Sequence, residues 1–251
     1  MTNVECQQVF ERLSEYIDGE LPEDLCGVLA EHIEDCAPCV EFVESLRPDW
    51  AWQDPFDDCS FTVQNGLEIH AANGRNLWFV NLSAPRVLRP VAGDWAAQTI
   101  CVPASEEKPA LGGLLLWKDR KNYLRLDRGV TGEHEILFMG CLGNRDMLIG
   151  RGRLQSDASG RVFLRLERGG DRVNALCSAD GENWFTVGHI EFPVEDPLQV
   201  GLHAIGSIDR TVYRGAYPDG TAIRFESFQL WEQHSVSLEL QGEFELDSRT
   251  G

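Results

Sequence analysis

The sequence is short of basic side chains: its 251 residues hold 22 Lys and Arg against 41 Asp and Glu, a formal net charge of -19. Direct binding to nucleic acid needs clustered Lys and Arg against the phosphates, so this balance argues against that class. The shortage is uneven, because residues 1–50 hold 13 acidic and 2 basic side chains, a net of -11, and the other 201 residues carry -8. We therefore expect a protein partner with a basic surface rather than a nucleic acid.

Long apolar runs are also absent: the best is Leu114–Trp117, far short of the roughly 18 residues that span a bilayer. The start, Met1–Glu5, lacks the basic and then apolar pattern of a secretory signal. Full disulfide pairing is not expected either, because three of the eight cysteines fit a metal motif and five is an odd remainder. These absences predict a soluble, cytoplasmic protein that makes no membrane contact and keeps its thiols reduced.

What the sequence does contain is a set of metal-ligand residues near its start. His32, Cys36 and Cys39 are spaced H-x3-C-x2-C, and Cys6 lies upstream. If the segment around Val28–Cys36 is helical, positions four apart share a face, so His32 and Cys36 point the same way. Three cysteines and one histidine form a standard tetrahedral zinc set, so we predict a zinc site here. The alternative is that these side chains are ordinary core residues of a helical hairpin.

Residues 1–46 carry the start and stop signals of short helices. Pro22 occupies a first-turn position, and Glu23 and Asp24 follow at the end of the helix that favours acidic side chains. Two apolar stripes have helical spacing: Val4, Val9, Leu13, Tyr16 and Ile17, then Leu25, Val28, Leu29, His32, Ile33 and Cys36. So few helices bury little apolar surface, whereas a structural zinc supplies about 10–16 kcal/mol of apparent binding energy. The metal is therefore expected to form the core of a small all-α module.

Three features of this module occur together: Cys6, the turn Tyr16–Leu21 with the pattern Tyr-x-Asp-Gly-Glu-Leu, and His32–Cys39. In this combination the module resembles the zinc-finger anti-sigma family. The resemblance implies a domain that binds an extracytoplasmic-function sigma factor and keeps it from RNA polymerase. Many relatives continue into a transmembrane helix, and the lack of one here favours a soluble regulator. Cys26 is either a spare thiol for a redox switch that ejects zinc or a small buried hydrophobe.

From about residue 56 the pattern changes to short β-prone runs separated by turn signals. These runs are Ala97–Val102, Gly113–Trp117, Asn122–Leu126, Glu135–Met139, Val162–Leu166, Val173–Cys177, Trp184–Val187, Val200–Ala204 and Ile223–Trp231. Strands and turns without intervening helices predict an antiparallel sandwich or jelly roll. The predicted class is therefore α+β multidomain, with a small all-α zinc module followed by an all-β sandwich. The segments are the module at 1–46, a linker at 47–55, the jelly roll at 56–233 and an acidic tail or added strand at 234–251.

Four segments of the β-rich part carry a second resemblance: Gly112–Asp119, Asn122–Leu126, Cys177–Trp184 and Val200–Ala204. They are similar to the concanavalin-like jelly-roll modules found beside β-xylosidase catalytic domains. In the third segment, Ser-x-Asp-Gly-x-x-Trp predicts a hairpin whose Asp-Gly pair makes the turn and whose Trp184 returns to the core. This is a signature of the fold rather than of an active site.

Glycoside hydrolysis needs two carboxylates about 5–9.5 Å apart, and jelly-roll glucanases commonly present them as Glu-x-Asp-x-Glu. The jelly-roll segment has no such run, and Glu243–Asp247 alternates in the same way but lies in the tail. We therefore predict no catalytic residues and no enzyme. Sugar binding stays open, because Trp78, Trp95 or Tyr217 could stack on pyranose rings if they are not part of the sandwich core.

The favoured function is a zinc-binding, anti-sigma-like transcription regulator whose jelly roll senses a ligand or mediates contacts. Zinc is its predicted cofactor, held by Cys6, His32, Cys36 and Cys39, and a sigma factor is its predicted partner. The alternative is a lectin-like protein that binds carbohydrate through the jelly roll, in which the zinc module is only a structural or docking unit.

Overall fold

The computed structural model describes residues 50–63, 66–154 and 159–233. Within these ranges the chain forms strands and no helix, and so contains no helix that could cross a membrane. The strands are β1 (Ala51–Gln53), β2 (Ser60–Val63), β3 (Leu67–Ala71), β4 (Leu77–Trp78), β5 (Asn81–Leu82), β6 (Arg86–Val91), β7 (Asp94–Pro103), β8 (Gly112–Asp119), β9 (Asn122–Arg128), β10 (Glu135–Leu142), β11 (Arg145–Arg153), β12 (Val162–Gly169), β13 (Arg172–Ser178), β14 (Phe185–Glu191), β15 (Leu198–Ala204) and β16 (Thr221–Gln233). The predicted α+β class is therefore wrong: the described chain is all-β, and the predicted helices at 1–46 lie outside the described residues.

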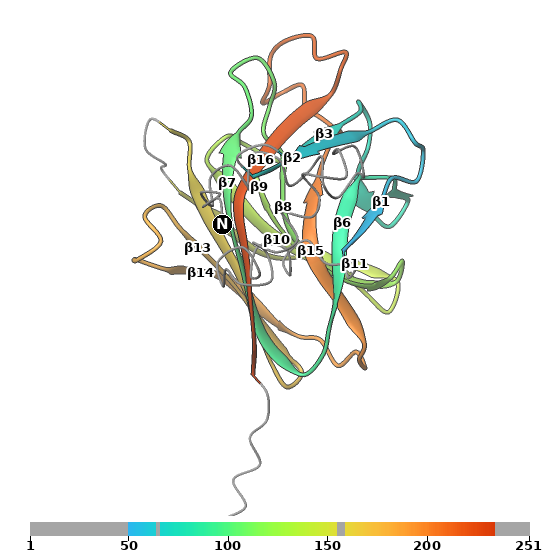
Figure 1. Ribbon diagram of the computed structural model, residues 1–251, viewed down its shortest axis with the longest axis vertical. Coiled ribbons are helices and arrows are strands. Elements are labelled where there is room, and N and C mark those ends of the chain that lie inside the picture. Colours follow the sequence, from blue (N-terminus) through green and yellow to red (C-terminus); the bar gives the residue numbers. More distant parts are fainter. Residues whose placement is uncertain (1–49, 64–65, 155–158, 234–251) are drawn as a thin grey trace, which may run out of the picture.

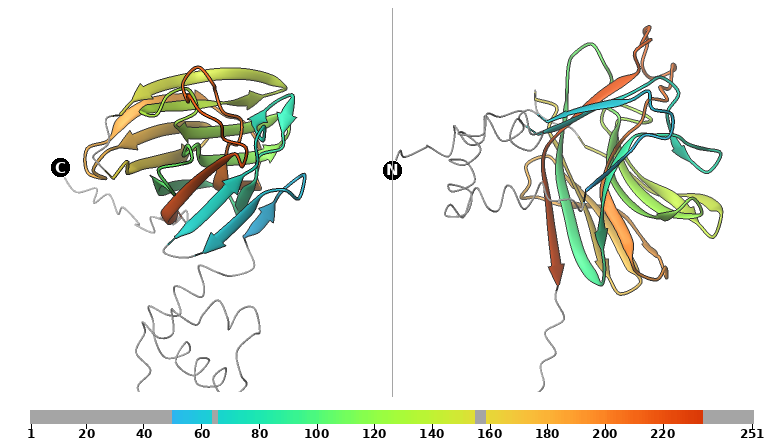
Figure 2. Two further views of the ribbon diagram at one scale, coloured as in Figure 1. Left: turned by 90° about the horizontal axis from the view of Figure 1, so that it is seen from above. Right: turned by 45° about the vertical axis from the view of Figure 1, so that its right-hand side comes forward.

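Two seven-stranded antiparallel sheets pack face to face as a sandwich (Figures 1 and 2). Sheet A has the order β1-β6-β15-β8-β9-β10-β11, and sheet B has the order β14-β13-β12-β7-β16-β3-β2. Strands distant in sequence lie side by side, as β16 beside β7 in Figure 1 shows. Strand β1 lies in the segment that the sequence suggests as a linker, and it pairs with β6 at the edge of sheet A. The strands β4 and β5 form a separate small hairpin.

The core between the sheets follows from the two-residue period of the strands. In β12, Val162, Leu164 and Leu166 are buried while the residues between them are less so, because successive side chains point to opposite faces. Phe138 from β10 and Trp95 from β7 join them in one apolar cluster. Trp95 is only 2% exposed, which removes it from the candidates for stacking on a sugar.

Sheet A is buried on its outer face as well, which positions the site described below. On β8, Leu114 and Leu116 face the main core, whereas Leu115 belongs to a second cluster with Tyr123 of β9. That cluster also contains Leu77 of β4, so the β4–β5 hairpin packs against the outer face of sheet A. Strands covered on both faces have continuous apolar runs rather than alternation, which is what residues 114–116 show.

The loop between β13 and β14 corrects one detail of the predicted hairpin. Gly181 has a φ of +79°, a conformation suited to glycine, and the Trp184 indole donates a hydrogen bond to its carbonyl at 3.0 Å. Trp184 does not return to the core, however. It is half-buried, with the Arg165 guanidinium 4.0 Å from its ring centroid, because it lies in the loop before β14 begins.

Candidate functional site

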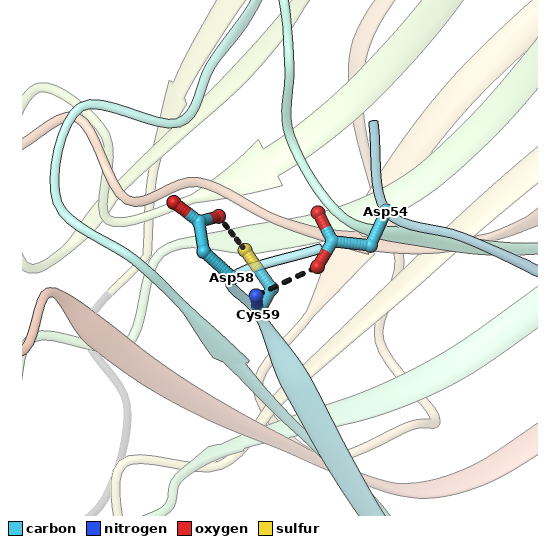
Figure 3. Close-up of side chains that lie close together, drawn as sticks. All are labelled: Asp54, Asp58 and Cys59. Atoms are coloured by element: carbon cyan, nitrogen blue, oxygen red, sulfur yellow. Dashed lines mark hydrogen bonds between the residues drawn. The ribbon is translucent and has the colours of Figure 1, made fainter. Parts of the chain in front are cut away.

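The four predicted zinc ligands, Cys6, His32, Cys36 and Cys39, lie outside the described residues. Within the described part, one group of side chains has the composition of a metal site. Donor atoms of Asp54, Asp58 and Cys59, beside β2, lie within 4.8 Å of one another (Figure 3). These three residues were not predicted as ligands, and their contacts decide whether they could act as such.

The donor atoms of this group are already used within the protein. Asp54 accepts a hydrogen bond from the Cys59 backbone N–H at 2.7 Å, and Asp58 forms an ion pair with Arg75 (Figure 3 shows the first). The Cys59 sulfur accepts the N–H of Ala72 at 3.4 Å. Burial raises the pKa of the Cys59 thiol to about 12, which opposes formation of the thiolate that a metal would need. The group therefore holds the loop before β2 in place.

A groove on the outer face of sheet A is a better candidate for a ligand site. It has a volume of about 320 Å³, within the range of small-molecule sites. The β4–β5 hairpin forms one wall, and strands β6 and β8 with the turn after β8 form the rest. Its lining residues are Phe79, Val80, Leu82, Arg86, Trp117 and Arg120. We call it the Arg86 groove.

Arg86 is held firmly in this groove. It is 8% exposed, and its guanidinium lies 4.5 Å from the ring centroid of Trp117. Its Nε donates to the Gln53 side-chain oxygen at 2.7 Å, and its Nη1 donates to the Leu82 carbonyl at 3.5 Å. Burial lowers the pKa of Arg86 to about 10, so the group remains a cation at neutral pH. The groove thus contains a fixed, positively charged donor.

Aromatic side chains surround this cation. The Trp117 ring stacks on Tyr123, with centroids 5.5 Å apart and an interplanar angle of 24°. At the tip of the β4–β5 hairpin, Trp78, Phe79 and Val80 are 46%, 41% and 72% exposed, so an apolar edge borders the groove. An apolar wall beside a few fixed polar groups is the usual composition of a small-molecule site.

A buried ionic cluster lies on the same face of sheet A as Arg86. His203 pairs with Arg86 in the strand register, and Asp127 lies two strands further along. The Asp127 carboxylate is 2.7 Å from Nε2 of His203 and 3.2 Å from Nε of Arg125, and all three side chains are almost fully buried. Burial alone would raise the pKa of Asp127, but Arg125 and His203 hold it below its usual value. This cluster stabilises the face on which the groove lies.

Of the aromatic residues that the sequence suggests for sugar stacking, Trp78 does not line the groove itself but is exposed beside the lining residue Phe79. Tyr217 lies in the segment between β15 and β16 and does not line the groove. Phe79, Arg86 and Arg120 were not predicted. The signal for the hairpin was the unbroken apolar run at residues 78–80, which a half-buried strand would have interrupted with polar positions.

Comparison with known proteins gives different results for the two parts of the chain. Residues 6–39 match a family model described as "Putative zinc-finger". The match begins at Cys6 and ends at Cys39, which are the first and last of the predicted ligands. The similarity is thus to a zinc finger and is confined to this segment at the start of the chain. No curated protein sequence matches the chain.

Solved structures match the sandwich. A functionally unknown protein from Saccharomyces cerevisiae has 14% identity and a TM-score of 0.57, with 74% of this chain and 97% of that chain covered. The GH43 protein BlXynB from Bacillus licheniformis has 15% identity and a TM-score of 0.56, over 72% of this chain and 36% of that chain. A xylan beta-1,4-xylosidase from Bacillus halodurans C-125 has 14% identity and a TM-score of 0.53, over 74% of this chain and 39% of that chain. This chain thus spans well under half of those two enzymes, and the likeness is one of fold.

The prediction that the chain is not an enzyme is wrong as an exclusion. It was based on the missing Glu-x-Asp-x-Glu run, yet chains described as GH43 proteins and a xylosidase share the sandwich fold. The absence of that run therefore does not separate this chain from glycoside hydrolases. The shared part is a minority of those chains at 14–15% identity, so it assigns no catalytic residue here either.

Proposed function

We propose that this protein is a zinc-binding, anti-sigma-like regulator in which Cys6, His32, Cys36 and Cys39 hold a zinc ion and the segment around them binds a sigma factor. The observation that carries the proposal is the zinc-finger match, which starts and ends at two of the four proposed ligands. A site with three thiolates and one imidazole has no open position for a substrate, so its zinc is structural.

Charge supports a protein partner for this segment. Residues 1–50 carry a net charge of -11, more than half of the total of -19. A concentrated negative charge speeds association with a basic surface and suppresses binding to acidic ones. We assign residues 1–46 to the zinc module and 234–251 to an acidic tail or added strand. The sandwich extends into the predicted linker at 47–55, because β1 pairs with β6 there, and continues through the predicted jelly roll at 56–233. The zinc ion would fix the module so that its acidic surface is presented to the sigma factor.

The test is capture of a sigma factor by the tagged full chain from cells that produce both proteins. We expect the full chain to retain the sigma factor and the Cys36→Ser, Cys39→Ser variant to lose it. Cys59→Ser is the matched control, because Cys59 is not part of the H-x3-C-x2-C motif and the variant should keep the partner. Retention of the sigma factor by the double variant, or no capture by the full chain, would contradict the proposal.

A second candidate function is favoured by the Arg86 groove: binding of a small saccharide by the sandwich, either as the signal for the regulator or as an independent activity. The groove combines an exposed aromatic ring, Phe79, with fixed donors from Arg86. Apolar sugar faces pack on aromatic rings while hydroxyl groups take the polar contacts.

This second function is tested by calorimetric titration of the full chain with short saccharides. Phe79→Ala should weaken any binding, because it removes the exposed ring from the groove. Phe185→Ala is the matched control, since Phe185 is 59% exposed on β14 of sheet B and should leave binding unchanged. If no saccharide binds, or if the two variants weaken binding equally, the groove is not a sugar site.

A further inference from the structure

The charged side chains of the Arg86 groove are of one sign. Of its six lining residues, Arg86 and Arg120 are charged and the other four are apolar or aromatic. No carboxylate lines the groove to balance the two guanidinium groups. A neutral sugar site needs both donors and acceptors for hydroxyl groups, whereas arginine offers donors only. The two guanidinium groups therefore favour a ligand that carries a negative charge over a neutral one.

Arg86 is one of two largely buried arginines of the described sandwich that have no acidic partner; the other, Arg128, donates to the carbonyls of Cys101 and Gly160. Arg168 pairs with Asp196 and Arg125 pairs with Asp127, whereas Arg86 forms no ion pair with a described residue. Its protein partners are an amide oxygen and a carbonyl oxygen, bound by Nε and Nη1. The Nη2 group has no hydrogen-bond partner among the described residues, so it is available to a ligand in the groove.

The carboxylate next to Arg120 in the sequence is engaged elsewhere. Asp119, which precedes Arg120, accepts the backbone N–H of Lys121 at 2.6 Å and is bonded to Asn122, so it stabilises the turn between β8 and β9. These hydrogen bonds hold the pKa of Asp119 below its usual value, against the opposing effect of burial. Arg120 is exposed on this turn and forms no ion pair with a described residue. The Nη2 group of Arg86 and the guanidinium of Arg120 are thus available to an external anion.

We infer that the Arg86 groove binds a saccharide that carries a carboxylate, such as a uronic acid unit, with Arg86 and Arg120 on the carboxylate and Phe79 against the apolar face of the ring. This inference rests on the second candidate function proposed above. The Arg120 guanidinium can present paired N–H donors to the two oxygens of a carboxylate, and Arg86 adds the donors of its Nη2. Such charge-assisted bonds are stronger than neutral ones. The restricted volume of about 320 Å³ suits a short saccharide end rather than a long chain.

The experiment compares two probes of equal length by calorimetric titration of the full chain at low salt: tetragalacturonate and the neutral galactose tetrasaccharide. We expect the uronate to bind at least about tenfold more tightly, since a single good charge-assisted contact is worth that much. The preference should shrink as salt is raised, because Arg120 is solvent-exposed and screened. Arg120→Gln should reduce the preference several-fold, and Arg172→Gln on β13 of sheet B should leave it unchanged.

The outcomes separate this inference from the functions on which it depends. Equal binding of both tetrasaccharides would overturn the carboxylate assignment and leave saccharide binding in place. If neither tetrasaccharide binds, both the carboxylate assignment and the saccharide-binding function are overturned. The zinc content and sigma-factor capture of the same preparation report independently on the regulator. A uronate preference that Arg120→Gln does not alter would also contradict the assignment, because the charge would then be recognised elsewhere.

Discussion

Replacing Asp127 by asparagine tests the buried cluster that supports the groove. Asp127 is fully buried on β9, 3.2 Å from Nε of Arg125 and 2.7 Å from Nε2 of His203. The substitution keeps the size of the side chain and a hydrogen-bond partner for His203, but it removes the negative charge. Arg125, only 2% exposed, would then be a buried cation without an acidic partner.

The expected loss of stability in Asp127→Asn follows from the buried, unpaired charge of Arg125. Removing one partner of a buried ion pair costs about 3–5 kcal/mol, because the remaining charge keeps its desolvation penalty and loses its attraction. Replacing both partners by neutral groups of similar size costs much less. The Arg125→Met, Asp127→Asn double variant should therefore recover at least half of the stability that Asp127→Asn loses.

The measurement is denaturation of the full chain in guanidinium chloride, followed by tryptophan fluorescence, for the unmodified chain and both variants. The midpoint and slope of each transition give the change in the free energy of unfolding. Trp95 and Trp117 belong to the two apolar clusters of the sandwich and report on its unfolding. A loss below about 1 kcal/mol for Asp127→Asn, or a double variant no more stable than the single one, would refute the ionic account of this cluster.

Gly150→Ala should lower the free energy of unfolding by at least about 2 kcal/mol, since a Cβ there would lie 2.0 Å from the Val187 carbonyl oxygen where β11 approaches β14. Gly169→Ala is the control: its Cβ would meet nothing within 4 Å, so the denaturation midpoint should change little. Cys59→Ser should leave the zinc content unchanged, because Cys59 is not one of the four proposed ligands and its sulfur already accepts the N–H of Ala72; loss of zinc would contradict this. The pKa of Asp127 is lowered in the folded state. Its contribution to stability is therefore complete above the unfolded-state pKa of about 3.9, and it is lost as pH falls through the folded-state pKa. The difference in the free energy of unfolding between the unmodified chain and Asp127→Asn should therefore be constant at neutral pH and become smaller below about pH 4. A difference that grows below about pH 4 would contradict a lowered pKa for Asp127.

Local sequence patterns predicted much of the sandwich. The alternation of Val162, Leu164 and Leu166 places a strand at β12, and Asp180-Gly181 marks the loop that follows β13. Strand order could not be read in the same way, because β16 pairs with β7 over a separation of more than a hundred residues. Side-chain alternation fixes which face is buried and carries no information on which strand lies next to it.

The Arg86 groove was beyond sequence reasoning for a related reason. Its lining comes from the β4–β5 hairpin, β6 and the end of β8, which are separate in the chain and meet only through sheet pairing and packing. Arg86 looked like any strand arginine until its lack of an acidic partner was visible in three dimensions. The zinc motif is the opposite case, because His32, Cys36 and Cys39 are close in sequence and their spacing alone carries the prediction.

The most direct test of the proposed zinc site is the metal content of the purified full chain, measured by inductively coupled plasma mass spectrometry after exhaustive dialysis. Four ligands in one tetrahedral set predict about one zinc ion per chain, falling to near zero in the Cys36→Ser, Cys39→Ser variant. A chain that holds no zinc when prepared without chelators, or a double variant that retains a full zinc ion, would contradict the assignment of Cys6, His32, Cys36 and Cys39.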